Sequence, residues 1–339
     1  MLAKDARSSL PGKTVPYVLR AGEGVCSLVA GQILRLVAGV DETSGGFGAV
    51  ACEATVDPVP VPLHYHEREH DTWFCTRGKL RLWSGNTSRI LSEGDFAYVK
   101  PGDVHAFQCI APHSQFFGSI APGGWESFFA AAGEEWPAMA GLPLKDHPMD
   151  FAKIGRAMGQ YRVMPTPEAK YADVSNGDET DRVLPDGPAS YVLQAGYGRR
   201  RRLNGHLSTA VLPMVVSNGT LEMRTIEAGH GAQMPAVYHE KTHVLLYMLE
   251  GMVRLTMNGE DHLLSAGDTA NIPAGVSYAT KVESCNGRWL LNAANGNGLD
   301  FWDTLGKETD EYIAAGSCDV AASADQIRRM TGGDIQVAS

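Results

Sequence analysis

The sequence lacks three features that would each point to a compartment or a partner. It has no run of about 18 apolar residues, the length that a membrane-spanning helix needs. Residues 1–15 are polar and lack the apolar core of a secretory signal. The six cysteines form no CxxC pair, and acidic residues outnumber basic ones to give a net charge of −10. We therefore expect a cytoplasmic protein with reduced thiols, and neither a membrane nor a nucleic acid as partner.

Common signature motifs are absent from the sequence as well. We find no P-loop, no GxGxxG fingerprint after a strand, no nucleophile elbow and no zinc-finger pairing. What is present is an ordinary globular composition, 44% apolar and 20% charged over 339 residues. That length is sufficient for two domains of usual size.

Short β-branched and aromatic runs, separated by Gly, Pro, Asn and Asp, fill most of the chain. This pattern is typical of an all-β sandwich or barrel. An internal repeat organises the runs. YVLRAGEG at 17–24 recurs as YVLQAGYG at 191–198, an offset of 174 residues, and LSEGD at 91–95 recurs as LSAGD at 264–268, an offset of 173. We therefore predict two copies of one β domain.

Helical sequence follows each copy. We predict helices over 124–136, 148–159, 299–316 and 323–330, and expect them to cover open sheet edges. The last of these carries Ser323 and Gln326 at the spacing of a capping box.

The stretch VPLHYHEREHDTWFCTRG holds the strongest chemical signal. His64 and His66 are two residues apart, so on a strand both side chains point to one face. Glu69 and Asp71 follow closely, and His105 lies further on in GDFAYVKPGDVHAF. Three imidazoles and a carboxylate suit a divalent transition metal. A lone histidine on an apolar strand is more often a core residue than a ligand, but three with an acid at these spacings indicate a metal site.

These spacings resemble the two motifs of the cupin superfamily. The first motif combines HxH with an acidic residue and a glycine, as in HYHEREHD before Gly78, and the second supplies a histidine after a glycine turn, as in PGDVH. With its two copies, the chain is similar to the fungal quercetin 2,3-dioxygenase group of bicupins, which act in secondary metabolism. The resemblance implies an all-β fold of two tandem cupin barrels (double-stranded β-helix or jelly-roll) with a few covering helices.

Five segments follow from the repeat and the resemblance. They are an arm at 1–15, an N-terminal cupin barrel with the metal site at 16–122, a helical connection and linker at 123–185, a C-terminal cupin barrel at 186–295 and C-terminal helices at 296–339. At an offset of 173, the four candidate ligand positions hold Val237, His239, Val244 and Tyr278. Since one donor of four is kept, we expect the second barrel to be metal-free. It would pair with the first barrel or complete a homodimer.

Carried over to this chain, the resemblance implies that His64, His66 and His105 bind the metal and that Asp71 stands where the family has a glutamate. Asp is one methylene shorter, so its carboxylate could ligate the metal, act as a base beside it or be idle, and Glu69 is the alternative acid. The donor set suits one divalent ion per chain, and Fe, Cu, Mn, Ni and Zn are not distinguished. Residues of the same strand parity would line a substrate pocket or simply pack the core: Trp73, Cys75, Phe107 and Cys109.

The function expected from the resemblance is that of a metal-dependent dioxygenase, an oxidoreductase with dioxygen as cosubstrate. It would oxidise or ring-cleave a small aromatic or enolic molecule, such as a flavonol or a polyketide-like metabolite. A non-oxidative isomerase, cyclase or lyase, with the metal as Lewis acid, is the alternative. A storage or binding bicupin is a third and weaker one.

Overall fold

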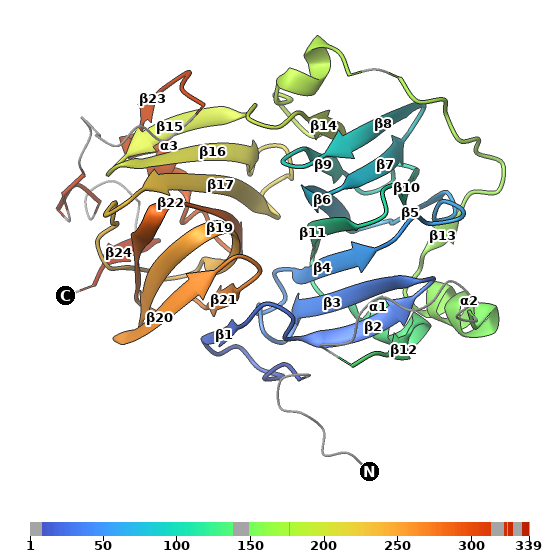
Figure 1. Ribbon diagram of the computed structural model, residues 1–339, viewed down its shortest axis with the longest axis horizontal. Coiled ribbons are helices and arrows are strands. Elements are labelled where there is room, and N and C mark those ends of the chain that lie inside the picture. Colours follow the sequence, from blue (N-terminus) through green and yellow to red (C-terminus); the bar gives the residue numbers. More distant parts are fainter. Residues whose placement is uncertain are drawn as a thin grey trace. The chain divides into compact units, whose positions relative to one another are not determined.

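A computed structural model describes residues 9–137, 149–175, 177–312, 322–323, 325–327 and 334–338. Antiparallel strands dominate these residues, and a few short helices accompany them (Figure 1). The all-β prediction is confirmed. Within the described ranges, no helix is long and apolar enough to cross a membrane.

The chain divides into two compact units, each with its own sheets. Unit 1 holds residues 22–41 and 47–197, and unit 2 holds 13–21, 42–46 and the residues after 197. Strand β1 (Tyr17–Leu19) pairs with β21 in unit 2, and its repeat equivalent β14 (Tyr191–Leu193) pairs with β9 in unit 1. The sequence places each strand with the barrel that follows it, because a repeat reveals which segments are equivalent and not which sheet each one joins.

Two antiparallel sheets form unit 1. The larger has the order β12–β2–β3–β4–β11–β6–β9–β14, and the smaller has the order β13–β5–β10–β7–β8. Their buried faces share one core cluster, in which Trp73, Leu80 and Cys109 come from three different strands. The bounds are β2 Val25–Val29, β3 Gln32–Ala38, β4 Gly48–Ala54, β5 His64–Tyr65, β6 His70–Arg77, β7 Lys79–Ser84, β8 Thr87–Ser92, β9 Phe96–Val99, β10 His105–Cys109, β11 Ser114–Ala121, β12 Glu134–Glu135 and β13 Met164–Pro165.

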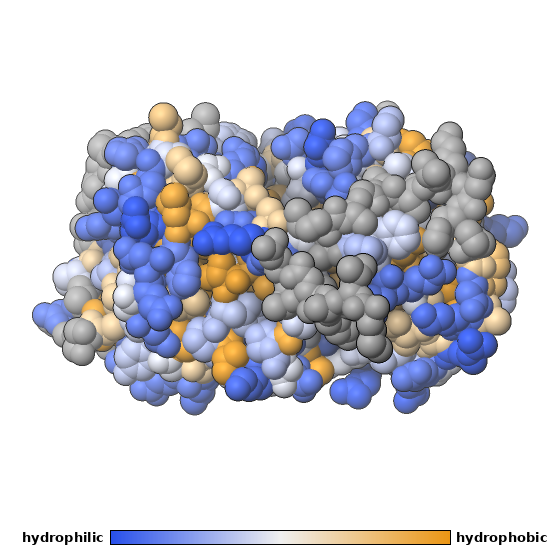
Figure 2. Space-filling model, turned by 60° about the horizontal axis from the view of Figure 1, so that its bottom comes forward, coloured by the Kyte–Doolittle hydropathy of each residue, from blue (hydrophilic) through white to orange (hydrophobic). Residues whose placement is uncertain are grey.

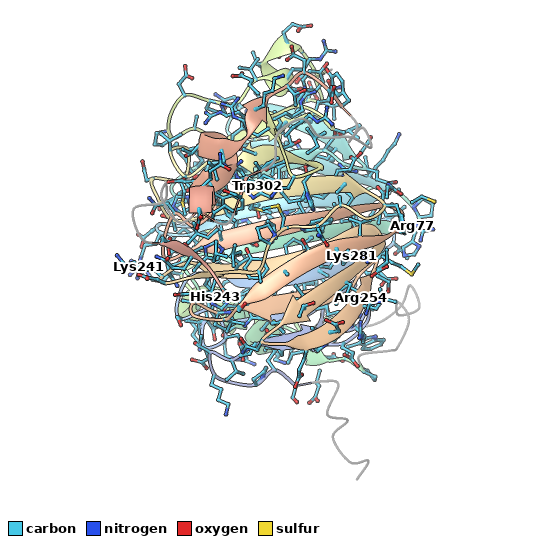
Figure 3. The ribbon with its side chains drawn as sticks, turned by 90° about the vertical axis from the view of Figure 1, so that its left-hand side faces the viewer. Arg77, Lys241, His243, Arg254, Lys281 and Trp302 are labelled. Carbon is cyan, nitrogen blue, oxygen red and sulfur yellow. The ribbon has the colours of Figure 1, made fainter. Side chains whose placement is uncertain are left out.

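Unit 2 is one large antiparallel sheet. Its main path runs β1–β21–β19–β22–β17–β16–β15–β23, with β18, β20 and β24 attached beside it. Trp302 packs into the core, whereas Arg254 and Lys281 lie opposite each other on the outer side of β19 and β22 (Figure 3). The bounds are β15 Arg199–Leu203, β16 His206–Leu212, β17 Glu222–Gly229, β18 Val237–His239, β19 His243–Met257, β20 Glu260–Ser265, β21 Thr269–Ile272, β22 Tyr278–Ala294, β23 Lys307–Glu308 and β24 Ile335–Val337.

The repeat is visible in the backbone at Gly78 and Gly251. Both have φ near the left-handed region, +73° and +75°. A Cβ on Gly78 would collide with the carbonyl oxygen of His113, and a Cβ on Gly251 would collide with that of Asn286. Gly251 lies 173 residues after Gly78, and Asn286 lies 173 residues after His113. The same turn therefore requires glycine in both copies for the same steric reason.

The predicted helices over 124–136 and 299–316 are shorter in the structure, the one over 148–159 is found as α2, and residues 324 and 328–330 of the last predicted helix lie outside the described ranges. The structure has α1 Ser127–Ala132, α2 Phe151–Gln160, α3 Asp300–Leu305 and a 3₁₀ turn at Glu179–Arg182. The predicted helix over 299–316 ends early because β23 follows and pairs with β15, and residues 313–316 are outside the described ranges. The predicted capping box is present: Ser323 N donates to Gln326 Oε1 at 2.8 Å, and Gln326 N donates to Ser323 Oγ at 3.2 Å.

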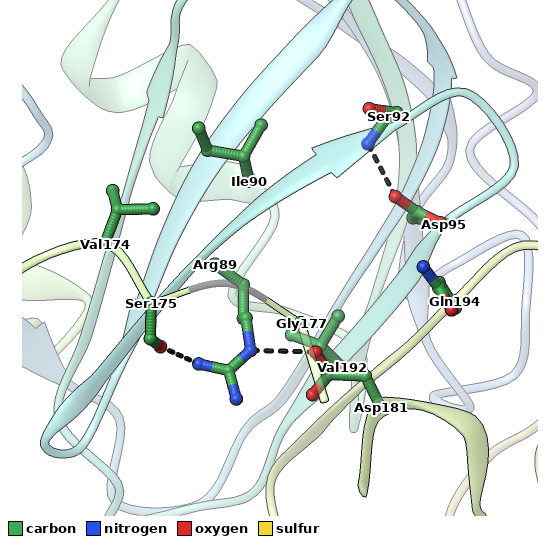
Figure 4. A pocket seen from close by; sticks show the side chains of 10 residues that line it. All are labelled: Arg89, Ile90, Ser92, Asp95, Val174, Ser175, Gly177, Asp181, Val192 and Gln194. Atoms are coloured by element: carbon green, nitrogen blue, oxygen red, sulfur yellow. Dashed lines mark hydrogen bonds and ion pairs between the residues drawn. The ribbon is translucent and has the colours of Figure 1, made fainter. Parts of the chain in front are cut away.

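A connection after α2 is fastened to unit 1 by Arg89 of β8. Its Nε donates to Asp181 Oδ2 at 2.8 Å, and its other nitrogens contact Ser175 and Asp178 (Figure 4). These residues border a surface pocket of about 280 Å³. The contacts of Arg89 with Ser175, Asp178 and Asp181 therefore hold the connection against β8.

Candidate metal centre

Strand pairing brings the three predicted histidines together. His105 in β10 lies directly opposite His64 in β5, and His66 follows two residues after His64. The donor nitrogens of the three rings are buried and lie within 4.8 Å of one another. The antiparallel pairing of β5 with β10 therefore places three imidazoles around one point in unit 1, as the sequence predicts.

Backbone carbonyls fix the tautomers of two of these rings. His64 Nδ1 lies 2.7 Å from the Pro62 carbonyl oxygen, and His105 Nδ1 lies 3.0 Å from that of Asp103. A carbonyl can only accept, so each Nδ1 carries the proton and donates it. Each Nε2 is then left with a free lone pair, which is the form of histidine that binds a metal.

Asp71 lies beside two of the three rings. Its Oδ2 is 3.2 Å from Nε2 of His66 and 3.2 Å from Nε2 of His105. Burial would raise the pKa of the Asp71 carboxyl, but the two adjacent imidazoles hold that pKa well below its usual range. The shorter side chain of aspartate thus reaches two of the histidines. The set of donor atoms that all lie within 4.8 Å of one another consists of the three imidazoles and does not include Asp71.

Several polar atoms at this point are buried and form no well-directed hydrogen bond, although Asp71 Oδ2 lies 3.2 Å from two of them. They are both ring nitrogens of His66, Nε2 of His105 and Oδ1 of Asp71. Buried polar atoms are nearly always hydrogen-bonded, and a buried lone pair without a partner lowers the stability of the fold. Two donors that share a tetrahedral ion at about 2.1 Å lie about 3.4 Å apart, close to the 3.2 Å between Asp71 and each ring. The residues therefore fit a bound divalent metal.

The electrostatics keep the site in its metal-binding form. Burial, with the neighbouring rings of His105 and His66, lowers the pKa of His64 to about 3. At neutral pH this ring is uncharged, and no proton competes with a metal for its lone pair.

An apolar cavity of about 300 Å³ opens on the histidines. Of the predicted pocket residues, Trp73 and Phe107 line it, whereas Cys75 and Cys109 belong to the packed core of unit 1 and do not. Glu69, the alternative acid, is partly exposed and is not among the lining residues either. All four candidate pocket residues point to the inner face of their strands, but the cavity extends along only part of each strand and so reaches two of them.

The sequence did not identify the aromatic residues that α1 and the turn before it add to the cavity. Trp125, Phe128 and Phe129 line it, and the Trp125 ring meets the His66 ring edge-on with centroids 4.6 Å apart. The segment GWESFF was predicted as part of a covering helix, and its run of aromatic residues was the available signal. At the surface, Val59 and Phe151 also border the cavity and are more than half exposed. Elsewhere, apolar side chains are scattered among polar ones on the face shown in Figure 2.

The equivalent position in unit 2 has a different chemistry. Val237 pairs with Tyr278 in the register that pairs His64 with His105, so the predicted correspondence of the two copies is confirmed. There His239 Nε2 contacts the Tyr278 hydroxyl at 3.0 Å. Val237 and Tyr278 line a cavity of about 30 Å³, and His239 is not among its lining residues.

Comparison with known proteins agrees with these observations. A family model described as "Cupin domain" matches residues 55–113 and 224–288, one match in each unit. The chain is 25% identical over 305 residues to quercetin 2,3-dioxygenase of Bacillus subtilis (strain 168), with 90% of each chain covered. It is 24% identical over 339 residues to quercetin 2,3-dioxygenase of Aspergillus japonicus, covering 88% of this chain and 93% of that one.

Solved structures show the same fold at lower identity. The protein Ylba from E. coli has a TM-score of 0.54 at 11% identity, covering 85% of this chain and 93% of that one. Oxalate decarboxylase from Lactobacillus farciminis, in a formate complex, has a TM-score of 0.53 at 14% identity, covering 84% and 87%. Two cupin matches, two full-length relatives and this fold identify the chain as a bicupin that resembles the quercetin 2,3-dioxygenases.

Proposed function

We propose that the chain is a metal-dependent dioxygenase that acts on a flat aromatic or enolic molecule such as a flavonol. The observation that carries the proposal is the group of buried imidazoles, with free Nε2 lone pairs, at the wall of an apolar cavity. The name shared by the two full-length relatives supports the oxidative reaction over the alternatives.

In this proposal His64, His66 and His105 hold one divalent transition metal, and Asp71 is the fourth ligand. Its Oδ2 already lies at donor spacing from two of the rings. When bound, the metal would bind an ionised substrate hydroxyl as a Lewis acid and give dioxygen access to the substrate's electrons.

The chain's own residues orient the substrate and exclude water from the reacting groups. Trp73, Phe107 and Trp125 line the cavity with aromatic rings, which suits a planar ligand, and their apolar surface excludes water from the reacting groups. The Nδ1 bonds of His64 and His105 keep both rings oriented toward the cavity while the substrate binds.

The test compares His66→Ala with His239→Ala, which removes the equivalent buried histidine of unit 2. Elemental analysis should give about one transition metal per chain for the wild type and for His239→Ala, and much less for His66→Ala. Oxygen uptake with quercetin should follow the metal content. A wild-type protein that carries no metal, or a His66→Ala protein that keeps both metal and oxygen uptake, would overturn the proposal. Conversion of the substrate without oxygen uptake would instead favour an isomerase, cyclase or lyase.

A further inference from the structure

We propose that Asp57 and Gln32 form a polar subsite that binds a hydroxyl group at the far end of the substrate from the metal. The inference rests on the proposed function, because it assigns the second end of the same aromatic ligand. Both side chains line the cavity that the three histidines line. Neither was singled out by the sequence, since both lie outside the cupin motifs.

Strand pairing sets the distance between the two ends of the cavity. The chain from Asp57 to His64 runs along β10: Asp57 N donates to the Cys109 carbonyl and Val61 N to the Phe107 carbonyl, each at 2.9 Å, and His64 lies opposite His105. Four residues of strand separate the Cys109 level from the His105 level, which corresponds to about 13 Å. Such a span accommodates a ligand of two or three fused or linked rings, with one end at the histidines and the other at Asp57.

Asp57 is a buried carboxylate whose hydrogen bonds are concentrated on one oxygen. Gln32 Nε2 donates to Oδ2 at 2.8 Å and Cys109 N donates to the same atom at 2.7 Å, so Oδ1 receives neither bond. The Cys109 thiol also hydrogen-bonds the Asp57 carboxyl, but a thiol is a weak donor that a ligand hydroxyl can replace or supplement. Among the described residues, no basic side chain forms an ion pair with Asp57.

The burial of the Asp57 carboxylate is unfavourable, and a hydrogen bond from a ligand can offset part of that free energy. Burial raises the pKa of the Asp57 carboxyl because dry surroundings disfavour its charge, and the hydrogen bonds from Cys109 and Gln32 offset only part of this effect. An ionised carboxylate can accept about four hydrogen bonds, and a hydroxyl donor from the ligand would supply one to Oδ1. Gln32 fixes the carboxylate in place and faces Cys52 through its own Oε1 at 3.9 Å. A buried polar group that a ligand must satisfy selects strongly for ligands that carry the matching donor.

Among the described residues, the wall between these two ends is mainly apolar, and the hydroxyl of Thr72 is already bonded to the backbone of Ser119. The residues between the two polar ends, such as Phe107, Phe116 and Val61, are apolar. They would accept any planar ring system of suitable width, because apolar contacts distinguish ligands weakly. Selectivity for the distal substituent is therefore assigned to Asp57 with Gln32.

The experiment measures binding to protein loaded with Zn²⁺, which supports binding without oxygen consumption. The probes are quercetin, which carries hydroxyls on its pendant ring, and the matched flavonol that lacks hydroxyls on that ring. Wild type should bind quercetin about 10- to 100-fold more tightly, the usual effect of a hydrogen bond to a charged group. Asp57→Asn should reduce that ratio at least fivefold while binding of the flavonol without pendant hydroxyls changes little.

Asp95→Asn is the matched control. Asp95 is another partly buried carboxylate of unit 1 that accepts two backbone hydrogen bonds, from Ser92 N and Ala195 N, and it does not line this cavity. This variant should keep the wild-type preference, and zinc content with a melting curve verifies that each variant is folded. Equal wild-type affinity for both flavonols, or an Asp57→Asn preference as large as that of the wild type, would overturn the subsite and leave the proposed function standing. If neither flavonol binds while zinc does, the flavonol substrate and the subsite both fail.

Discussion

The contribution of Asp71 to metal binding can be tested by the variant Asp71→Asn. Asparagine keeps the shape of the side chain and removes the charge that lies 3.2 Å from Nε2 of both His66 and His105. Loss of a partner at such a site typically weakens metal binding 10- to 100-fold. At a free metal concentration of 100 times the wild-type Kd, bound metal stabilises the wild-type fold by about 2.7 kcal/mol, because the increment is RT ln(1 + [L]/Kd).

The same free metal concentration would be only about 1 to 10 times the Kd of the variant. Its increment should then be about 0.4–1.4 kcal/mol. Urea unfolding with and without buffered metal measures both increments, and Asp95→Asn should retain the wild-type value. If the Asp71→Asn increment equals that of the wild type, the carboxylate is not a ligand and the three histidines hold the metal without it.

Three further predictions concern the fold and the second unit. Unit 2 should bind no transition metal of its own, so Tyr278→Phe and His239→Ala should leave the metal content at about one per chain. Burial lowers the pKa of His206 and of His239 to about 4 each, so both rings stay neutral in the fold. Their contribution to stability is complete above the unfolded pKa of about 6.5 and is lost as the pH falls toward 4, by up to about 3 kcal/mol per ring. His206→Phe should therefore flatten the fall in the urea midpoint between pH 6.5 and 4, and an unchanged slope would contradict the assignment. Gly78→Ala should destabilise the fold by more than about 2 kcal/mol, because it adds a steric collision to the cost of a left-handed backbone. Gly85→Ala, at φ +55° with open space around its Cβ, should cost about 1 kcal/mol, and equal losses in the two variants would refute the collision.

The sequence predicted the repeat, the all-β fold and the three convergent histidines because each depends on local spacing. The HxH pair needs only the alternation of a strand, and the third histidine needs the register that places His105 opposite His64. The inward direction of the Asp71 side chain follows from the same alternation along β6. Its Oδ2 comes within 3.2 Å of Nε2 of both rings, so the shorter side chain reaches them, and its role as ligand or base stays a prediction.

The features that the sequence did not predict depend on contacts between distant segments. The exchange of β1 and β14 is a choice of sheet edge, and both segments carry the same YVL letters, so no local pattern distinguishes the two pairings. The extent of the cavity depends on where α1 packs. That packing supplies Trp125 and Phe129 as lining residues, whereas Cys75 and Cys109 are left in the core despite their correct parity.

The two units offer an internal comparison that bears on the metal. They share the fold, the glycine turns and the strand register of the candidate site. In unit 2 the tyrosine at the position of His105 gives His239 Nε2 a hydrogen-bond partner at 3.0 Å. In unit 1 the corresponding nitrogen, His66 Nε2, and Nε2 of His105 instead face a carboxylate oxygen, Asp71 Oδ2, at 3.2 Å without a well-directed hydrogen bond. Because Nδ1 of His105 donates its proton to the Asp103 carbonyl, the Nε2 lone pair faces the carboxylate oxygen of Asp71, which places one acceptor against another. A cation between the two groups would satisfy both, which supports the metal site in unit 1.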